Sequence, residues 1–145
     1  MAATAGTDQA KPVVGPEGAA SEIVGHVASG GGAGIQADLK SIAAAGGYGM
    51  CVVTALVAQN TQGVREIHTP PQEFLVAQLD AVFDDVEVDA VKIGMLGTAE
   101  LMGAVAGWLE ETRPAVVVLD PVMVASSGDA LTAVGDDDGC AAWSR

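Results

Sequence analysis

The stretch that most constrains the fold of this chain is CVVTALVA, residues 51–58, which is apolar and β-branched almost without a break. A strand with one face in water alternates apolar and polar residues, and this run does not alternate. It therefore predicts a strand covered on both faces, as in a parallel sheet between layers of helices. Gln59 and Asn60 follow at its carboxyl end, where open α/β sheets bind their ligands.

Segments with helical and strand patterns lie on both sides of this run. Apolar residues at offsets of four and three predict a helix over 35–45, which Gly46 and Gly47 end. A weaker strand is predicted within 21–27, and residues 61–68 predict a short strand or flap. The chain therefore begins as strand, helix, strand.

The same alternation continues downstream. Thr69–Gln72 resembles a capping box, so we expect a helix that runs to about Val86. A short strand is expected at 89–93, a helix capped by Thr98 to about 112, and a second buried strand at 115–119. This order predicts an α/β, three-layer domain with a parallel sheet and right-handed crossovers.

The two ends of the chain lack such patterns. We expect residues 1–21 to be a disordered arm, 22–131 to form the domain, and 132–145 to be an irregular tail. The acidic run at 136–138 is interpreted as solvated tail, because adjacent carboxylates point in different directions. No Cys and His spacing typical of a metal site is present, so we predict no metal ligands.

Charge and composition exclude several classes of protein. The net charge of −13, with six Lys and Arg, argues against nucleic-acid binding, which needs clustered cations. There is no signal peptide and no apolar segment near the ~20 residues that span a bilayer. Two cysteines form no disulfide framework. We therefore expect a cytoplasmic protein that binds neither nucleic acid nor membrane.

The densest site-forming signal is SGGGAGIQADLK, residues 29–40. Glycines running into a helix allow close approach to an anion or a polar ring, although a flexible connector is the competing interpretation. The stretch matches the dinucleotide fingerprint only loosely, and the chain has no P-loop.

Polar residues also follow the predicted strands: Gln59, Lys92 and Asp120, with Asp38 one turn into the first helix. An amide and a carboxylate match the donor and acceptor edge of an aminopyrimidine. The alternatives are a helix-dipole role for Asp38 and a loop anchor for Gln59. We interpret His26 and His68 as isolated strand-end or surface residues.

Four blocks carry a family resemblance: GGGAGIQADLK, YGMCVVTALVAQNTQGV, KIGMLG and LDPVMVASSGD. In this order they resemble the N-terminal half of hydroxymethylpyrimidine/phosphomethylpyrimidine kinase, of the ribokinase-like superfamily. The resemblance implies ATP- and Mg²⁺-dependent phosphorylation of 4-amino-5-hydroxymethyl-2-methylpyrimidine and its monophosphate in thiamine biosynthesis. It implies that Asp120 lies on the phosphate and magnesium side. It also implies a pyrimidine pocket formed by Gly34, Asp38, Val57, Gln59, Met95 and Val122.

The chain departs from the family pattern at both ends. His26, Val27 and Ala28 replace a Gly-Ser/Thr-Asp run, and the Gly-Thr-Gly-Cys anion hole is absent, so catalytic residues stay unassigned. Cys140 lacks that context. We expect a truncated or frame-shifted kinase domain with little or no activity. The alternatives are a non-catalytic fragment that needs a partner and a pyridoxal-kinase-like enzyme; homo-oligomers through exposed sheet or helix surfaces are also expected.

Overall fold

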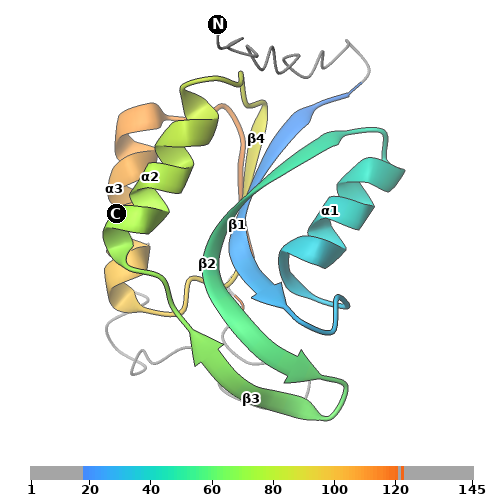
Figure 1. Cartoon of the computed structure of the whole chain (residues 1–145). Coiled ribbons are helices and arrows are strands. Elements are labelled where there is room, and N and C mark those ends of the chain that lie inside the picture. Colours follow the sequence, from blue (N-terminus) through green and yellow to red (C-terminus); the bar gives the residue numbers. More distant parts are fainter. Residues whose placement is uncertain (1–17, 121, 123–145) are drawn as a thin grey trace, which may run out of the picture.

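The computed structural model describes residues 18–120 and 122. A five-stranded sheet, in the order β3-β2-β1-β4-β5, forms the middle of the molecule (Figure 1). The strands are β1 (Ala20–Ala28), β2 (Tyr48–Asn60), β3 (Gly63–His68), β4 (Ala90–Ile93) and β5 (Val117–Leu119). The helices are α1 (Gly34–Ala44), α2 (Gln72–Phe83) and α3 (Ala99–Thr112).

Helices cover both faces of the sheet, which confirms the three-layer prediction. Helix α1 lies on one face, and α2 and α3 lie together on the other (Figure 1). The larger core fills the space between the sheet and the helix pair, and the ring of Phe83 meets that of Trp108 edge-on at 4.5 Å between centroids. Its buried members are Val24, Val52, Leu75, Leu79, Val91, Ile93, Leu96, Leu101, Met102, Val105 and Trp108.

The sheet is mixed, so the prediction of a wholly parallel sheet is wrong at one strand. Strand β1 pairs in parallel with β2 and β4, and β4 pairs in parallel with β5. Strand β3 runs antiparallel to β2. The residues between β2 and β3, Thr61 and Gln62, are too few for a crossover, so this connection can only form a hairpin. The hairpin extends past the helical layers (Figure 1).

Strand β1 is longer and more buried than its sequence suggests. It begins at Ala20, two residues before the domain boundary that we expected, and it occupies the centre of the sheet. Its polar residues Glu22 and His26 are both buried. Of the strand-end or surface interpretation of His26, the surface part is therefore wrong, because the layers on the two faces of the sheet bury the side chains of its central strand.

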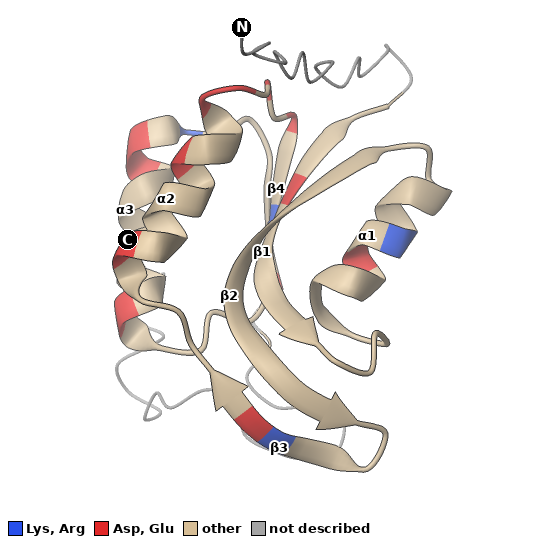
Figure 2. Ribbon diagram, viewed as in Figure 1, with Lys and Arg blue, Asp and Glu red and all other residues tan. Residues whose placement is uncertain are grey.

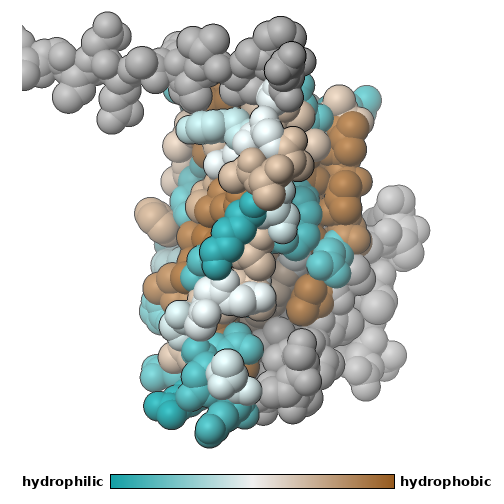
Figure 3. Space-filling view, turned by 90° about the vertical axis from the view of Figure 1, so that its right-hand side faces the viewer, coloured by the Kyte–Doolittle hydropathy of each residue, from teal (hydrophilic) through white to brown (hydrophobic). Residues whose placement is uncertain are grey.

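Strand β5 is the opposite case. The prediction of a buried strand at 115–119 is wrong, because Val116, Val117, Val118 and Leu119 are 41–53% exposed. Within residues 18–120 and 122, the strand lies at one edge of the sheet and pairs with β4 alone. An apolar strip runs along the right-hand edge of the molecule in Figure 3, where β5 lies.

The helix ends test two capping predictions. Thr98 caps α3 as predicted, because its Oγ1 accepts a hydrogen bond from the Leu101 amide at 3.2 Å. The capping box at Thr69 is wrong: α2 has Pro71 at its N-cap, with no side-chain bond. Two prolines separate Thr69 from the first turn, so Thr69 lies too far upstream to cap it.

Much of the negative charge lies away from the glycine loop. Acidic residues lie along α2 and α3 (Figure 2), and they are exposed. Between residues 18 and 120, no helix is both long and apolar enough to span a bilayer.

Candidate functional site

The glycine loop after β1 is held against the end of β2. The Ser29 hydroxyl donates to the Gln59 carbonyl at 2.7 Å and accepts from the Gln59 amide at 2.8 Å. The Ser29 amide donates to the Val57 carbonyl at 3.2 Å. The first two bonds fix the Gln59 backbone and the third ties the loop to Val57, all through Ser29, a residue to which the sequence pattern gave no role.

Two α1 side chains hold the loop from its other side. Gln36 donates to the Ala28 carbonyl at 2.7 Å and accepts from the Ala28 amide at 3.1 Å. Lys40 Nζ donates to the Gly31 carbonyl at 2.9 Å. The competing interpretation of a flexible connector is therefore not supported, because the loop is bound to both neighbouring elements.

Gly34 is required for its backbone conformation and for its lack of a side chain. Its φ is +65°, and a Cβ would overlap the His26 carbonyl oxygen and lie 3.1 Å from His26 Nε2. Glycine alone accepts both conditions without strain. The start of α1 therefore packs directly on the carboxyl end of β1.

A small apolar cluster lies beside this loop. Ala55, Val57 and Met95 are buried together, and Val64, Ile67 and Val122 pack against them. Thr54 Oγ1 donates to the Met95 carbonyl at 2.6 Å, which fixes the segment after β4. Three residues of the predicted pyrimidine pocket, Val57, Met95 and Val122, are thus brought together from three distant parts of the chain.

The charged part of the site joins α1, β4 and the end of β5. Lys92 Nζ donates to Asp38 Oδ2 at 2.7 Å and lies 3.6 Å from Asp120 Oδ2. The Asp120 amide donates to the Ile93 carbonyl at 2.8 Å. Asp38 and Asp120 therefore lie near each other, as their places at strand and helix ends predicted, and Lys92 is the link between them.

His26 lies within the electrostatic reach of this ion pair. Burial lowers the pKa of its imidazole, the positive charge of Lys92 lowers it further, and Asp38 partly opposes these effects. These effects together favour the neutral form of the ring. A lone histidine in a weak strand pattern gave no signal that could have placed it here.

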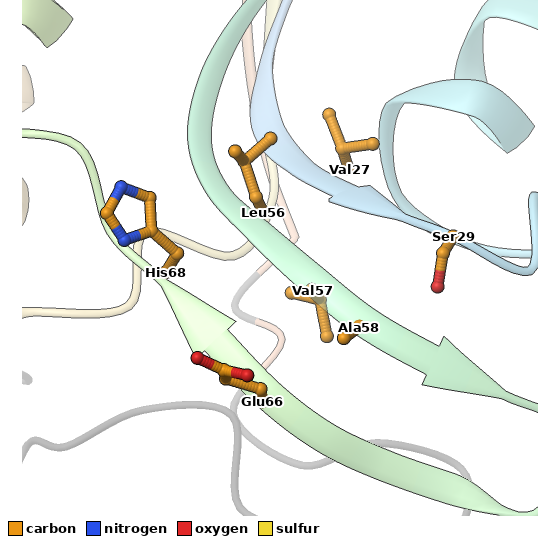
Figure 4. Close-up of a pocket in the computed structure, with 7 residues that line it drawn as sticks. All are labelled: Val27, Ser29, Leu56, Val57, Ala58, Glu66 and His68. Carbon is orange, nitrogen blue, oxygen red and sulfur yellow. The ribbon is translucent and has the colours of Figure 1, made fainter.

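A cavity of about 330 Å³ opens near the hairpin (Figure 4). Its lining comes from the end of β1, from β2 and from β3: Val27, Ser29, Leu56, Val57, Ala58, Glu66 and His68. Of the predicted pyrimidine-pocket residues, only Val57 lines it. Gly34, Asp38, Gln59, Met95 and Val122 do not, so this cavity is not the site that the sequence predicted.

Comparison with known proteins identifies the class of protein. The fold matches a crystal structure of phosphomethylpyrimidine kinase from Clostridium difficile 630 with a TM-score of 0.77 and 38% identity, over 86% of this chain and 52% of that one. It also matches pyridoxal kinase from Staphylococcus aureus in complex with AMP-PCP and pyridoxal, with a TM-score of 0.66 and 28% identity, over 77% and 41% of the two chains. The fold is that of the ribokinase-like small-molecule kinases, as predicted.

The sequence comparisons identify the family. The family model for phosphomethylpyrimidine kinase matches residues 28–139, and the chain belongs to that family. It is 69% identical to the thiamine biosynthesis multifunctional protein ThiED of Corynebacterium glutamicum, over 70% of this chain and 13% of that protein. It is 54% identical to hydroxymethylpyrimidine/phosphomethylpyrimidine kinase of Escherichia coli, over 70% and 38%. The chain thus spans less than two fifths of either relative.

Proposed function

We propose that this chain forms the substrate side of a hydroxymethylpyrimidine/phosphomethylpyrimidine kinase, which phosphorylates 4-amino-5-hydroxymethyl-2-methylpyrimidine and its monophosphate with ATP. Two observations support this most: Lys92 binds Asp38 beside the end of β4, and Ser29 holds the Gln59 backbone at the end of β2. Val57, Met95 and Val122 belong to one apolar cluster. We infer the substrate and the thiamine pathway from the names of the relatives.

The proposed pocket uses each kind of group for a different part of the ring. We place the planar ring and its methyl group against the apolar cluster that contains Val57 and Met95. The Asp38 carboxylate accepts hydrogen bonds, and the Gln59 amide both donates and accepts, so together they suit an aminopyrimidine edge. Gly34 allows α1 to approach this edge closely.

The transfer of the phosphoryl group needs groups that the described residues do not supply. Phosphoryl transfer depends on positioning and on stabilising charge, and the Gly-Thr-Gly-Cys motif does not occur in these 145 residues. Among residues 18–120 and 122, no three metal-ligating side chains form a cluster, and the Lys92 ammonium group already pairs with Asp38 and lies 3.6 Å from Asp120 Oδ2. These residues do not fit a Mg²⁺ site alone. We therefore propose that these 145 residues by themselves bind the pyrimidine with little or no turnover.

Calorimetric titration with the hydroxymethylpyrimidine tests this function. We expect weak binding by the chain, and a Gln59→Ala variant should lose at least tenfold in affinity. Because Ser29 holds the Gln59 backbone, this change removes only the side-chain amide. Gln62→Ala, in the exposed turn two residues after β2, is the matched control and should bind as the unchanged protein does.

Two results would contradict the proposal. Binding that Gln59→Ala leaves intact would mean that the pocket lies elsewhere. Tighter binding of pyridoxal than of the pyrimidine would favour the pyridoxal-kinase alternative, which the likeness to the Staphylococcus aureus enzyme keeps open. A coupled assay that finds ordinary kinase turnover for a protein of these 145 residues would disprove the expected loss of activity.

A further inference from the structure

Lys92 has a position that neither the family match nor the predicted pocket explains. It lies in β4, next to the central strand, and its ammonium group reaches across to α1. There it contacts two carboxylates, at 2.7 Å from Asp38 Oδ2 and 3.6 Å from Asp120 Oδ2. One cation thus joins three elements that are far apart in sequence.

The surroundings of Lys92 make this contact stronger than an ion pair on the open surface. The side chains of Lys92 and Asp38 are 27% and 28% exposed, so water screens their attraction only in part. The ammonium group passes over Gly94, where a Cβ would lie 3.4 Å from Nζ. A bulkier residue than glycine at 94 would crowd the path of the lysine side chain.

We propose that Lys92 is a positioning residue, which orients the Asp38 carboxylate toward the pyrimidine pocket by binding Asp38 and Asp120 at once. This inference rests on the proposed function for its ligand. Without Lys92, the carboxylates of Asp38 and Asp120 lie near each other with no cation between them. Their repulsion turns the Asp38 side chain away, and α1 loses its charged contact with the sheet.

Two variants at this position separate charge from mere packing. Lys92→Met keeps the length and removes the charge, whereas Lys92→Arg keeps the charge. Arg65→Met is the matched control, because Arg65 is an exposed cation of β3 and its loss changes the net charge equally. We expect Lys92→Met to weaken pyrimidine binding at least tenfold, Lys92→Arg to stay within about threefold of the unchanged protein, and Arg65→Met to have no effect.

His26 gives a readout that does not depend on the pyrimidine. The chain has two histidines, and His68 is exposed while His26 is buried beside the ion pair, so their NMR titrations are distinguishable. Lys92→Met should raise the pKa of His26, because it removes a neighbouring positive charge and frees the Asp38 carboxylate. It should also speed amide hydrogen exchange in residues 38–42 of α1. Lys92→Arg should change neither.

The two proposals can fail separately. If the unchanged protein does not bind the pyrimidine, the proposed function is wrong, and the role of Lys92 is decided by the His26 titration and by exchange in α1. If Lys92→Met binds the pyrimidine as tightly as the unchanged protein, or leaves the pKa of His26 unchanged, Lys92 does not position Asp38.

Discussion

At the scale of single residues, the burial of the Glu22 carboxyl group is the feature that the sequence pattern did not predict. Glu22 lies in the central strand with no exposed surface, and within the described part of the chain neither carboxylate oxygen has a hydrogen-bond partner. Burial raises the pKa of this carboxyl group to about 7. Cys51 lies near it, and burial, together with the Glu22 charge, raises the pKa of its thiol.

Glu22 should make the stability of the protein fall as the pH rises. Its pKa is about 7 when folded and about 4.5 when unfolded, so between these values the folded state binds more protons. The group's contribution is fully present below pH 4.5 and is lost as the pH passes 7, by on the order of 3 kcal/mol. Urea unfolding of Glu22→Gln at pH 5–8 should lack this loss.

Glu111→Gln, at an exposed position of α3, is the control for this measurement, because it also removes one negative charge. Its pH dependence should match that of the unchanged protein. If Glu22→Gln and the unchanged protein lose stability in parallel from pH 5 to 8, the carboxyl group of Glu22 has an ordinary pKa.

Gly34 makes a second prediction at this scale. Gly34→Ala should lower the free energy of unfolding by about 2 kcal/mol or more, because the added Cβ meets the His26 carbonyl and the backbone φ is +65°. Thermal unfolding checks this. Gly107→Ala, in the middle of α3 with open space around it, should instead stabilise by about 0.5–1 kcal/mol. Equal effects at the two positions would contradict the packing of α1 on β1.

At the scale of elements, the caps of α2 and α3 differ in a way that substitution can measure. Thr98→Ala should cost about 1 kcal/mol of stability, because it removes the acceptor of the Leu101 amide. Thr69→Ala should cost less than half as much, since α2 has no side-chain cap. Chemical unfolding of both variants tests the pair. If Thr69→Ala lost more stability than Thr98→Ala, the result would support the capping box that the sequence predicted.

The helix and strand patterns predicted the elements well because each reports which side of an element is covered. The stripe of Leu101, Val105 and Trp108 is buried as its spacing indicated, and α1 begins within one residue of its predicted start. The direction of β3 was not predictable in the same way. A short strand pattern fixes neither its partner nor its direction, which here follow from the brief connection to β2.

At the scale of the whole molecule, the exposed edge strand β5 is the feature that favours self-association. Among the described residues β5 pairs on one side, with β4, and its apolar residues on both faces favour pairing with a second copy of the chain on the other. We predict concentration-dependent association, which Val118→Lys should suppress in light scattering. Phe74→Lys, at an exposed apolar position of α2, is the control and should still associate. A monomer at all concentrations would contradict this prediction.

The candidate site could be predicted only as a set of positions. The carboxyl ends of parallel strands converge, so the sequence alone indicated that Asp38, Gln59, Lys92 and Asp120 belong to one end of the sheet. It could not indicate that Lys92 joins two of them, because Asp38 and Lys92 are 54 residues apart and no local pattern reports such a contact.

By itself, the sequence determined the order of the elements, the layered fold and the kinase family, because periodicity, glycines and ordered motifs are local properties of a chain. Only the tertiary structure decided which faces are covered and which charges meet. In the tertiary structure, Glu22 and His26 are buried in the central strand, whereas β5 is exposed at the edge. The physical reason is that burial and electrostatics depend on neighbours from distant segments, and these neighbours are set by packing.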